Sequence, residues 1–270
     1  MILKNKIQIY CVTDKVLNYF KKLPYIFAGV GNRKFPKNYL LSNNFINIHY
    51  KEKNYSELTF HYWFWKNMLK KINKDTWIGF CQKRRFWLKK CSSQGKVNIN
   101  NLNKNIINFF PKEWSKYDSV ISKPIFVNNM KKMKILKRGF RSLIKDPKIF
   151  FDTRKQTVKL HFDMHHGYGN LDKAINLLDS NDKNEFKIFV NNSNSFNPHL
   201  MFISKPSVAN LWFSNLFPWL FRCEKEFSFG SLSGYDTTRL YAYLAERYLS
   251  FWFRKYTNYI EWPVVTLKHY

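Results

Sequence analysis

Runs of apolar residues alternate with polar segments along the first third of the chain, and their spacing predicts a strand, a helix and a second strand. The first strand, residues 7–13 (IQIYCVT), is short and almost wholly apolar. Residues 54–71 carry apolar side chains at helical spacing, with Asn54 as the N-cap and Glu57 closing a capping box. The second strand is predicted over residues 75–87, DTWIGFCQKRRFW, where the apolar run stops on three consecutive cations.

The rest of the chain is predicted to contain shorter strands and longer helices. We expect a strand at residues 117–124, a polar loop at residues 161–169 followed by a helix capped near Asn170, a strand at residues 199–204, and a helix at residues 237–255 capped by Asp236. Pro206 is predicted to open a further helix, and Pro218 to kink or end it. This order predicts an α/β fold with a mostly helical C-terminal portion. Because no segment resembles a long linker, residues 1–270 are predicted to form a single domain.

The chain is strongly basic. Its 46 Lys and Arg against 18 Asp and Glu give a net charge of +28, which attracts nucleic acid, an anionic membrane face or phosphorylated small molecules. The aromatic content of 19% excludes a disordered chain. Residues 84–160 carry more than half of the net charge. Within them, KKMKILKRGFRSLIK alternates cations with apolar residues, a pattern typical both of a basic amphipathic helix on a membrane and of a solvated face.

Cysteine spacing and the N-terminal residues indicate an intracellular protein. The four cysteines are Cys11, Cys81, Cys91 and Cys223. They lie far apart and form no C-x-x-C pair, so neither a disulfide framework nor a zinc knuckle is expected. Residues 1–15 lack the long apolar run of a signal peptide, and residues 201–221 are too polar and proline-rich for a membrane span. We expect a cytoplasmic protein, either free or held peripherally on the inner face of the plasma membrane.

Seven fragments of the sequence occur in the order of a known family pattern. They are YSELTFHYWFWKN, IGFCQKRRF, YDSVISKP, HHGYGNLDKAI, MFISKP, RLYAYLAERYLSFW and WPVV, and with the first strand they span residues from about 7 to 267. One such match is weak evidence, whereas seven collinear matches are strong evidence of homology. The chain resembles a bacterial glycosyltransferase family of capsule, exopolysaccharide and O-antigen clusters, long catalogued as a domain of unknown function.

This resemblance implies a GT-A-like fold and a sugar transferase. Residues from about 1 to 125 would form the nucleotide-sugar-binding part, and residues from about 126 to 270 the acceptor-side, helical part. The implied reaction moves a hexose from a nucleoside-diphosphate donor to a growing surface polysaccharide or lipid-linked glycan. The donor would be UDP-linked, and some family members are associated with galactofuranose. The expected partners are therefore the donor, the glycan acceptor and an anionic membrane surface, with no specific nucleic acid.

The chain departs from the family pattern at several positions. Gln82 and Lys83 replace a His-Tyr pair before the two arginines, Asp14 replaces a histidine after the first strand, Asn170 replaces an Asp, and Leu200 replaces an Asn before MFI. These changes bear on donor choice, acceptor choice and activity itself.

The resemblance also implies a binding site for the donor diphosphate. In many GT-A enzymes an apolar strand ends in Asp-x-Asp, which holds a divalent cation against that group. Here the matching place carries Lys83, Arg84 and Arg85, and guanidinium groups bind phosphate oxygens directly. No cofactor is therefore expected, although Mn²⁺ and Mg²⁺ stay open, and the alternative is a generic basic patch. The other predicted nucleotide-sugar-binding residues are Thr13, Lys15, Val30, Gly31, Lys66, Asn67 and Arg239, with helix C-capping an equal alternative for Lys66 and Asn67.

An inverting transfer also needs a general base for the acceptor hydroxyl. The segment HFDMHH supplies His165 and His166, which fit the His pair of the family, and a histidine with a near-neutral pKa can act as a base. The further candidates are Asp163, Asp172 and Asp236. A structural His–Asp hydrogen bond is the alternative for this cluster, and Glu246 with Arg247 is expected to form an internal ion pair.

Two other functional classes stay open from the residues alone. A nucleic-acid-binding protein would account for the charge and the aromatic residues, but these fall at core spacing and no K/R-G-F/Y-G/A-F motif occurs. A metal-dependent phosphoesterase would use His161, Asp163 and His165 as ligands. Such an enzyme would lose activity with a chelator, whereas an arginine-based transferase would keep it.

Overall fold

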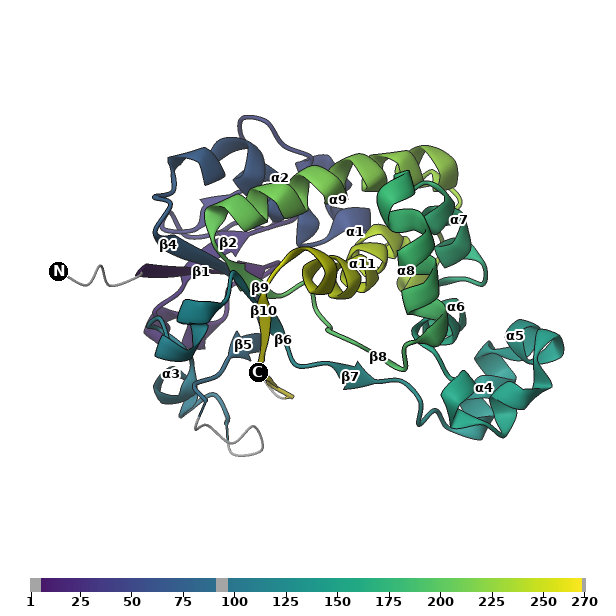
Figure 1. Cartoon of the computed structure of the whole chain (residues 1–270). Coiled ribbons are helices and arrows are strands. Elements are labelled where there is room, and N and C mark those ends of the chain that lie inside the picture. The colour runs from purple at the N-terminus through teal and green to yellow at the C-terminus, as the bar shows by residue number, and fades with distance from the viewer. Residues whose placement is uncertain (1–5, 91–96, 269–270) are drawn as a thin grey trace. The chain divides into compact units, whose positions relative to one another are not determined.

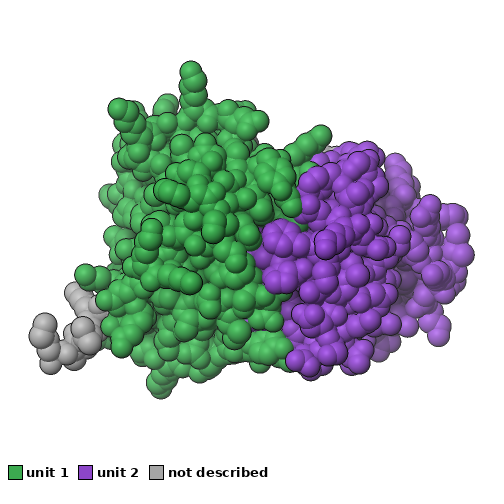
Figure 2. All heavy atoms as spheres, turned by 90° about the horizontal axis from the view of Figure 1, so that it is seen from above, with its two compact units in different colours: residues 1–123, 199–215, 253–270 green, residues 124–198, 216–252 purple. Residues whose placement is uncertain are grey.

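The computed structural model describes residues 6–90 and 97–268, and the chain divides into two compact units (Figure 2). Unit 1 consists of residues 1–123, 199–215 and 253–270, and unit 2 of residues 124–198 and 216–252. The chain thus first leaves unit 1 near residue 125 and later returns to it twice. That residues 1–270 act as a single domain stays a prediction.

Unit 1 is built on a mixed sheet (Figure 1). Its strands are β1 (Lys6–Thr13), β2 (Ile26–Gly29), β3 (Leu40–Leu41), β4 (Thr76–Gln82), β5 (Arg85–Trp87), β6 (Ser119–Ser122), β9 (Phe202–Ser204), β10 (Tyr259–Trp262) and β11 (Val264–Thr266). The main path runs β10-β6-β9-β4-β1-β2-β3, while β5 pairs with β4 and β11 pairs with β5. Strands β3, β2, β1 and β4 are parallel, and β9 runs antiparallel to both β4 and β6.

The central strands are apolar on both faces because both faces are covered. On one face Tyr10 of β1 contacts Phe64 of helix α2 (Leu58–Asn67), with ring centroids 4.7 Å apart. On the other face Ile9 and Cys11 belong to an aromatic-rich core that includes Trp77. The strands predicted near residues 7, 117 and 199 are therefore present, and β6 and β9 are shorter than the predicted segments.

The prediction of one continuous helix over residues 54–71 is wrong. The structure has α1 (Glu52–Tyr55), then α2, then the 3-10 helix η3 (Leu69–Lys71). Ser56 separates α1 from α2 because its φ of 52° lies in the left-handed region. The predicted capping box is also absent, since Asn54 lies inside α1 and the side chain of Glu57 makes no cap hydrogen bond. The remaining short helices of unit 1 are η1 (Asn18–Lys22), η2 (His49–Lys51), α3 (Leu102–Asn105) and η5 (Lys112–Lys116).

Unit 2 is mostly helical. It contains α4 (Lys132–Arg138), α5 (Phe140–Lys145), η6 (Pro147–Phe150), η7 (Thr153–Lys155), α6 (Val158–His166), α7 (Asn170–Asn176), α8 (Ser180–Asn192), α10 (Tyr235–Thr238) and the paired strands β7 (Ile125–Phe126) and β8 (Ser195–Phe196). Two long helices, α9 (Pro206–Phe227) and α11 (Leu240–Tyr256), begin in one unit and end in the other.

Three local predictions in this region are wrong. HFDMHH belongs to helix α6 rather than to a loop, because Thr157 caps that helix by accepting the N–H of Leu160 at 3.4 Å. Helix α9 starts at Pro206 as predicted and continues through Pro218, so Pro218 does not end it, and a kink there stays a prediction. Asp236 lies within α10 and does not cap the last long helix.

The predicted fold class is confirmed: the protein has an α/β architecture with a mixed sheet that is parallel from β3 to β4, flanking helices and a mostly helical C-terminal portion (Figure 1). Among the described helices, none combines the length and the apolar character that crossing a membrane requires. Cys11, Cys81 and Cys223 are buried free thiols, and Cys91 lies outside the described residues.

Candidate active site

The sheet of unit 1 has a topological switch between β1 and β4. From β1 the chain goes to β2 and β3 on one side, and it then crosses back to β4 on the other side. In open α/β sheets ligands bind beyond the carboxyl ends of the strands at such a point. Thr13 ends β1 and Gln82 ends β4, and the register pairs Val12 with Gln82. The side chains just after Thr13 and Gln82 are therefore at the expected ligand position.

The three cations of the predicted strand form a hairpin at this position. Strand β4 ends at Gln82, Lys83 and Arg84 make the turn, and Arg85 begins the returning strand β5. The backbone N–H of Lys83 donates to the carbonyl of Val12 at 3.1 Å, which ties the turn to the end of β1. We call residues 83–85 the cationic hairpin.

Two side chains of the cationic hairpin are held in different ways. Lys83 Nζ lies 2.5 Å from Asp14 Oδ1, so an acidic residue of the β1 loop partly neutralises it. Arg85 Nη1 donates to Gln82 Oε1, a neutral acceptor that orients the guanidinium. Gln82 Nε2 donates in turn to Glu57 Oε1 and, over 3.0 Å, to the carbonyl of His199. Arg85 is thus fixed at the switch point by a chain of hydrogen bonds.

The segment before β9 adds a strained backbone to the same edge. His199 and Leu200 have φ values of 80° and 49°, in the left-handed region that non-glycine residues seldom adopt. Such strain concentrates at ligand sites. Asparagine tolerates this region far better than leucine. The Asn that the family resemblance leads us to expect at position 200 therefore suits this backbone, and Leu200 does not.

The predicted residues after β1 and β2 shape the edge through their own contacts. Thr13 Oγ1 donates to the carbonyl of Lys15 at 2.5 Å and accepts its N–H at 3.2 Å. The N–H of Val30 donates to the carbonyl of Thr13 at 2.9 Å. Gly31 has a φ of 79°, which its lack of a Cβ permits, and its Cα faces the carboxylate of Glu52. Thr13, Lys15, Val30 and Gly31 therefore lie together at the switch point.

Lys66 and Asn67 do not lie at this edge. Glu57 at the N-terminal end of α2 contacts Gln82, and the ten residues of the helix put its other end about 15 Å away along the axis. Asn67 Nδ2 donates to the carbonyls of Trp63 and Ile46, each at 2.8 Å. The expectation that these two residues reach the Arg85 end of β4 is wrong. A helix that leads into a parallel strand ends near the first residue of that strand, and Arg85 follows the last residue of β4. The helix-capping alternative fits Asn67.

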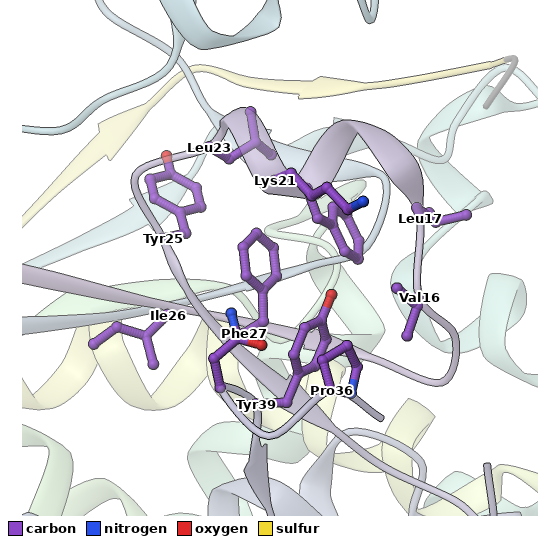
Figure 3. Close-up of a pocket in the computed structure, with 11 residues that line it drawn as sticks. Val16, Leu17, Lys21, Leu23, Tyr25, Ile26, Phe27, Pro36 and Tyr39 are labelled. Atoms are coloured by element: carbon purple, nitrogen blue, oxygen red, sulfur yellow. The ribbon is translucent and has the colours of Figure 1, made fainter. Parts of the chain in front are cut away.

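A pocket of about 400 Å³ lies beside the loop that leaves β1. Figure 3 shows Phe27 and Tyr39 beneath the short helix η1, with Val16 on the adjoining loop. Stacked rings form its apolar wall: the ring of Phe27 stacks on Phe20 and on Tyr39. Besides the tyrosines Tyr25 and Tyr39, the polar lining side chains are those of Lys21 and Asn38. Helix η1 also carries Tyr19, whose hydroxyl donates to the carbonyl of Lys83, so one helix borders both the pocket and the cationic hairpin.

In unit 2, helix α6 places His161 and His165 one turn apart on one face, and their rings stack with centroids 4.5 Å apart. The buried Arg247 donates from Nη2 to His161 Nδ1 over 3.2 Å, so that nitrogen is an acceptor and the ring is neutral. Burial, assisted by the charge of Arg247, lowers the pKa of His161 to about 2. Arg247 also pairs with Glu246, which confirms the predicted internal ion pair.

His165 and His166 differ in what their rings can do. His165 Nδ1 lies 2.8 Å from the carbonyl of His161, so it carries the proton and Nε2 keeps its lone pair. His166 Nδ1 bonds the carbonyl of Asp236 at 2.9 Å, but its ring is buried and stacks on Tyr243. Burial lowers the pKa of both rings, to about 4 for His166. Both are neutral near pH 7, and His165, which is half-buried, is the better placed base.

Asp163 and Asp172 are engaged by one lysine. Lys159 Nζ lies 2.6 Å from Asp163 Oδ2 and 2.9 Å from Asp172 Oδ2. Asp163 Oδ1 also accepts the N–H of Gly169 at 3.1 Å, which fixes the turn before α7. Burial raises the pKa of Asp163, and the ion pair with Lys159 opposes that shift. These contacts give Asp163 a structural role and favour a histidine as the base.

Asp236 and Arg239 also lie in unit 2, at α10 and its C-terminal end. Asp236 Oδ2 forms an ion pair with Arg138 Nη1 at 3.2 Å. A role for Arg239 in nucleotide binding stays a prediction.

The predicted metal alternative is not assembled on α6. His161 and His165 share one face of the helix, whereas Asp163 turns to Lys159. Within the part of the chain that the structure describes, no group of three or more His, Cys, Asp or Glu side chains is arranged to hold a metal ion. The phosphoesterase hypothesis therefore loses the cluster on which it rested.

Comparison with known proteins now decides the family. A family model described as a domain of unknown function, DUF4422, matches residues 8–258. The chain belongs to the DUF4422 family. This match confirms the family resemblance that the seven sequence fragments predicted. A search of curated proteins gives no match.

The fold of this DUF4422 protein recurs in a solved structure, the apo form of WbbM, a bifunctional glycosyltransferase. The two chains are 16% identical and superpose with a TM-score of 0.65. The match covers 98% of this chain and 46% of the WbbM chain, so the protein spans less than half of that structure. At this identity the comparison shows a shared fold.

Sequence analysis missed three groups at the switch point of this DUF4422 chain. Glu57 is predicted only as a capping acid, Gln82 only as a departure from the family pattern, and the carbonyl of His199 gives no sequence signal. The departure at Gln82 is the available clue, since the last residue of a strand that turns back through two arginines is well placed to orient one of them.

Proposed function

We propose that this DUF4422 protein is a glycosyltransferase that takes a hexose from a nucleoside-diphosphate donor, most simply a UDP-hexose. The observation that carries the proposal is the cationic hairpin at the β1–β4 switch point, where Gln82 orients Arg85. The shared fold with a bifunctional glycosyltransferase supports it.

The hairpin suits the chemistry of a leaving diphosphate. As the glycosidic bond breaks, negative charge builds up on the diphosphate, and preorganised cationic donors stabilise that charge. Arg84 and Arg85 would supply the hydrogen bonds, with Lys83 beside them. This arrangement needs no divalent cation, so we propose metal-independent transfer. The base of the nucleotide would enter the pocket next to η1, whose aromatic wall offers a flat ring a stacking surface.

The family resemblance supports the proposal for the acceptor. We propose a growing surface polysaccharide or a lipid-linked glycan as the acceptor. For an inverting transfer, His165 Nε2 would remove the proton from the attacking hydroxyl as the new glycosidic bond forms and the bond to the diphosphate breaks. UDP-galactofuranose is one candidate donor among the UDP-hexoses.

The proposal is tested by thermal unfolding with nucleotides. UDP should stabilise the protein, by about 2.7 kcal/mol at a hundredfold excess over its dissociation constant, because it binds only the folded state. The effect should persist in EDTA and disappear in Arg84→Ala/Arg85→Ala. Lys104→Ala, which removes an exposed charge from α3 of the same unit, is the matched control. Absence of a shift with UDP, GDP or CMP would count against a transferase, and a loss in EDTA restored by Mn²⁺ would contradict the metal-free site.

A further inference from the structure

Helices α4 and α5, with η6 after them, carry two sets of apolar side chains. The inner set, Ile135, Leu143, Ile149 and Phe150, packs with Leu160 and Met164 of α6 in a separate hydrophobic cluster. The outer set is exposed and consists of Met133 (61%), Leu136 (39%), Phe140 (59%), Ile144 (65%) and Phe151 (80%). Because the inner set already holds this segment on α6, packing within unit 2 does not require the outer set.

The outer set stands among cations. Residues 131–155 contain ten Lys and Arg against two Asp, a local net charge of +8. Exposed cations flank the outer side chains along the whole segment; they include Lys131, Lys132, Lys137, Arg141 and Lys148. Single exposed apolar residues are ordinary on protein surfaces, whereas five large ones within about twenty residues mark an interaction surface.

The combination selects among polyanionic partners. Phosphates of a nucleic acid would use the cations but would gain nothing from exposed Met, Leu and Ile side chains. A lipid surface uses both, because apolar side chains enter the boundary of the acyl chains while Lys and Arg stay at the anionic headgroups. We propose that residues 131–155 bind an anionic membrane surface, with the outer set inserted and the cations on the lipid phosphates.

This surface adjoins the histidines of unit 2. Lys134 and Arg138 of α4 lie close enough to His165 for their charges to lower its pKa, in addition to the effect of burial. A membrane-bound segment would therefore keep the candidate base near the headgroups, where the sugar of a lipid-linked acceptor is found. The membrane proposal itself does not rest on the proposed transferase activity.

The test is flotation of the full chain with vesicles of phosphatidylcholine alone or mixed with phosphatidylglycerol. The protein should bind the mixed vesicles, and binding should fall in high salt. Lys137→Glu with Lys148→Glu should lower the partition coefficient at least about tenfold, since each cation contributes near an anionic surface. Phe140→Ser with Ile144→Ser should lower it by a similar factor at unchanged charge, because less apolar area is inserted.

Matched measurements separate this proposal from its alternatives. Ile188→Ser removes an equally exposed apolar side chain from α8 and should leave binding unchanged. Equal binding to neutral vesicles, or binding that neither double variant weakens, would overturn the proposal. Binding to a random oligonucleotide that only the Lys137→Glu/Lys148→Glu variant reduces would assign the surface to nucleic acid instead. UDP affinity should be the same in all these variants, so failure here is distinct from failure of donor binding.

Discussion

In the proposed transferase, Arg85 is the residue on which donor chemistry would depend most directly, because Gln82 orients its guanidinium at the switch point. If its contact with the diphosphate strengthens as the glycosidic bond breaks, Arg85→Ala must lower kcat more than donor affinity. The expected loss is about 2.7–4 kcal/mol of transition-state stabilisation, a hundredfold or more in kcat. Steady-state kinetics together with UDP titration measures the two effects separately.

Gln82→Ala tests the Arg85 guanidinium indirectly, by removing the side chain that orients it. The guanidinium stays in the protein but loses its oriented acceptor, so kcat should fall by less than in Arg85→Ala. Near-full turnover in both variants would mean that the cationic hairpin is ordinary surface charge.

The pH dependence of turnover should identify the base. A base acts in its neutral form, and burial lowers the pKa of His165, so the acidic limb of kcat/KM should lie below the ordinary histidine value of about 6.5. His165→Gln should abolish that limb and lower kcat at unchanged UDP affinity. His166→Gln should instead reduce stability, because the ring packs on Tyr243. If His165→Gln keeps the wild-type profile, the base lies elsewhere.

At the scale of single elements, the polar residues that line the pocket beside η1 test where the nucleotide base binds. Lys21→Ala with Asn38→Ala should raise the UDP dissociation constant several-fold, since both side chains line the pocket and neither is buried. Lys22→Ala changes the adjacent exposed cation, which is absent from the lining, and should leave UDP affinity nearly unchanged. Isothermal titration measures both, and equal affinities in the two variants would move the base out of this pocket.

The elements also show how far the sequence alone leads. Continuous apolar runs predicted β1, β4 and β9 because strands buried on both faces tolerate little else. The break at Ser56 was not predictable, since a left-handed serine has no local signature and depends on tertiary contacts. HFDMHH looks like a loop because it is rich in polar residues. Asp163 pairs with Lys159 of the same helix, whereas His161 and His166 bond Arg247 and the carbonyl of Asp236, which come from distant segments of unit 2.

The sequence predicts the cations of the candidate site, but it does not predict the residues that orient them. The motif carries Arg84 and Arg85 directly, and the strand end places them at the switch point. Lys66 and Asn67 are close in sequence to β4, but they lie away from its Arg85 end because the two ends of α2 are about 15 Å apart. Gln82 and Glu57 become partners only when α2 packs on β4.

At the scale of the whole molecule, buried histidines should make the protein sensitive to mild acid. Burial lowers the pKa of His61 to about 3, among Phe80, Phe202 and Phe213, and that of His166 to about 4. Below about pH 6.5 these histidines become protonated in the unfolded chain but stay neutral in the folded protein. The free energy of unfolding must therefore fall as the pH drops toward 4.

His61→Leu should flatten this dependence by up to about 1.4 kcal/mol per pH unit. His49→Leu, at a partly exposed position, controls for the loss of a histidine as such. Urea denaturation of the three proteins between pH 4 and 7 measures the slopes. Parallel curves for the wild type and His61→Leu would contradict the role of the buried ring.

The sheet order also constrains how the protein emerges from a ribosome. Strand β9 separates β6 from β4, and β10 and β11 complete the sheet with residues up to Thr266. During translation the edge of β6 that later pairs with β9 therefore stays unpaired while the ribosome synthesises about eighty more residues. This takes several seconds at 5–20 residues per second. A nascent chain at that stage exposes the strand edges most prone to aggregate. The unit 1 sheet thus closes only after the segment through β11 has been synthesised, and chaperones that bind exposed strand edges have a long opportunity to act between the synthesis of β6 and that of β9.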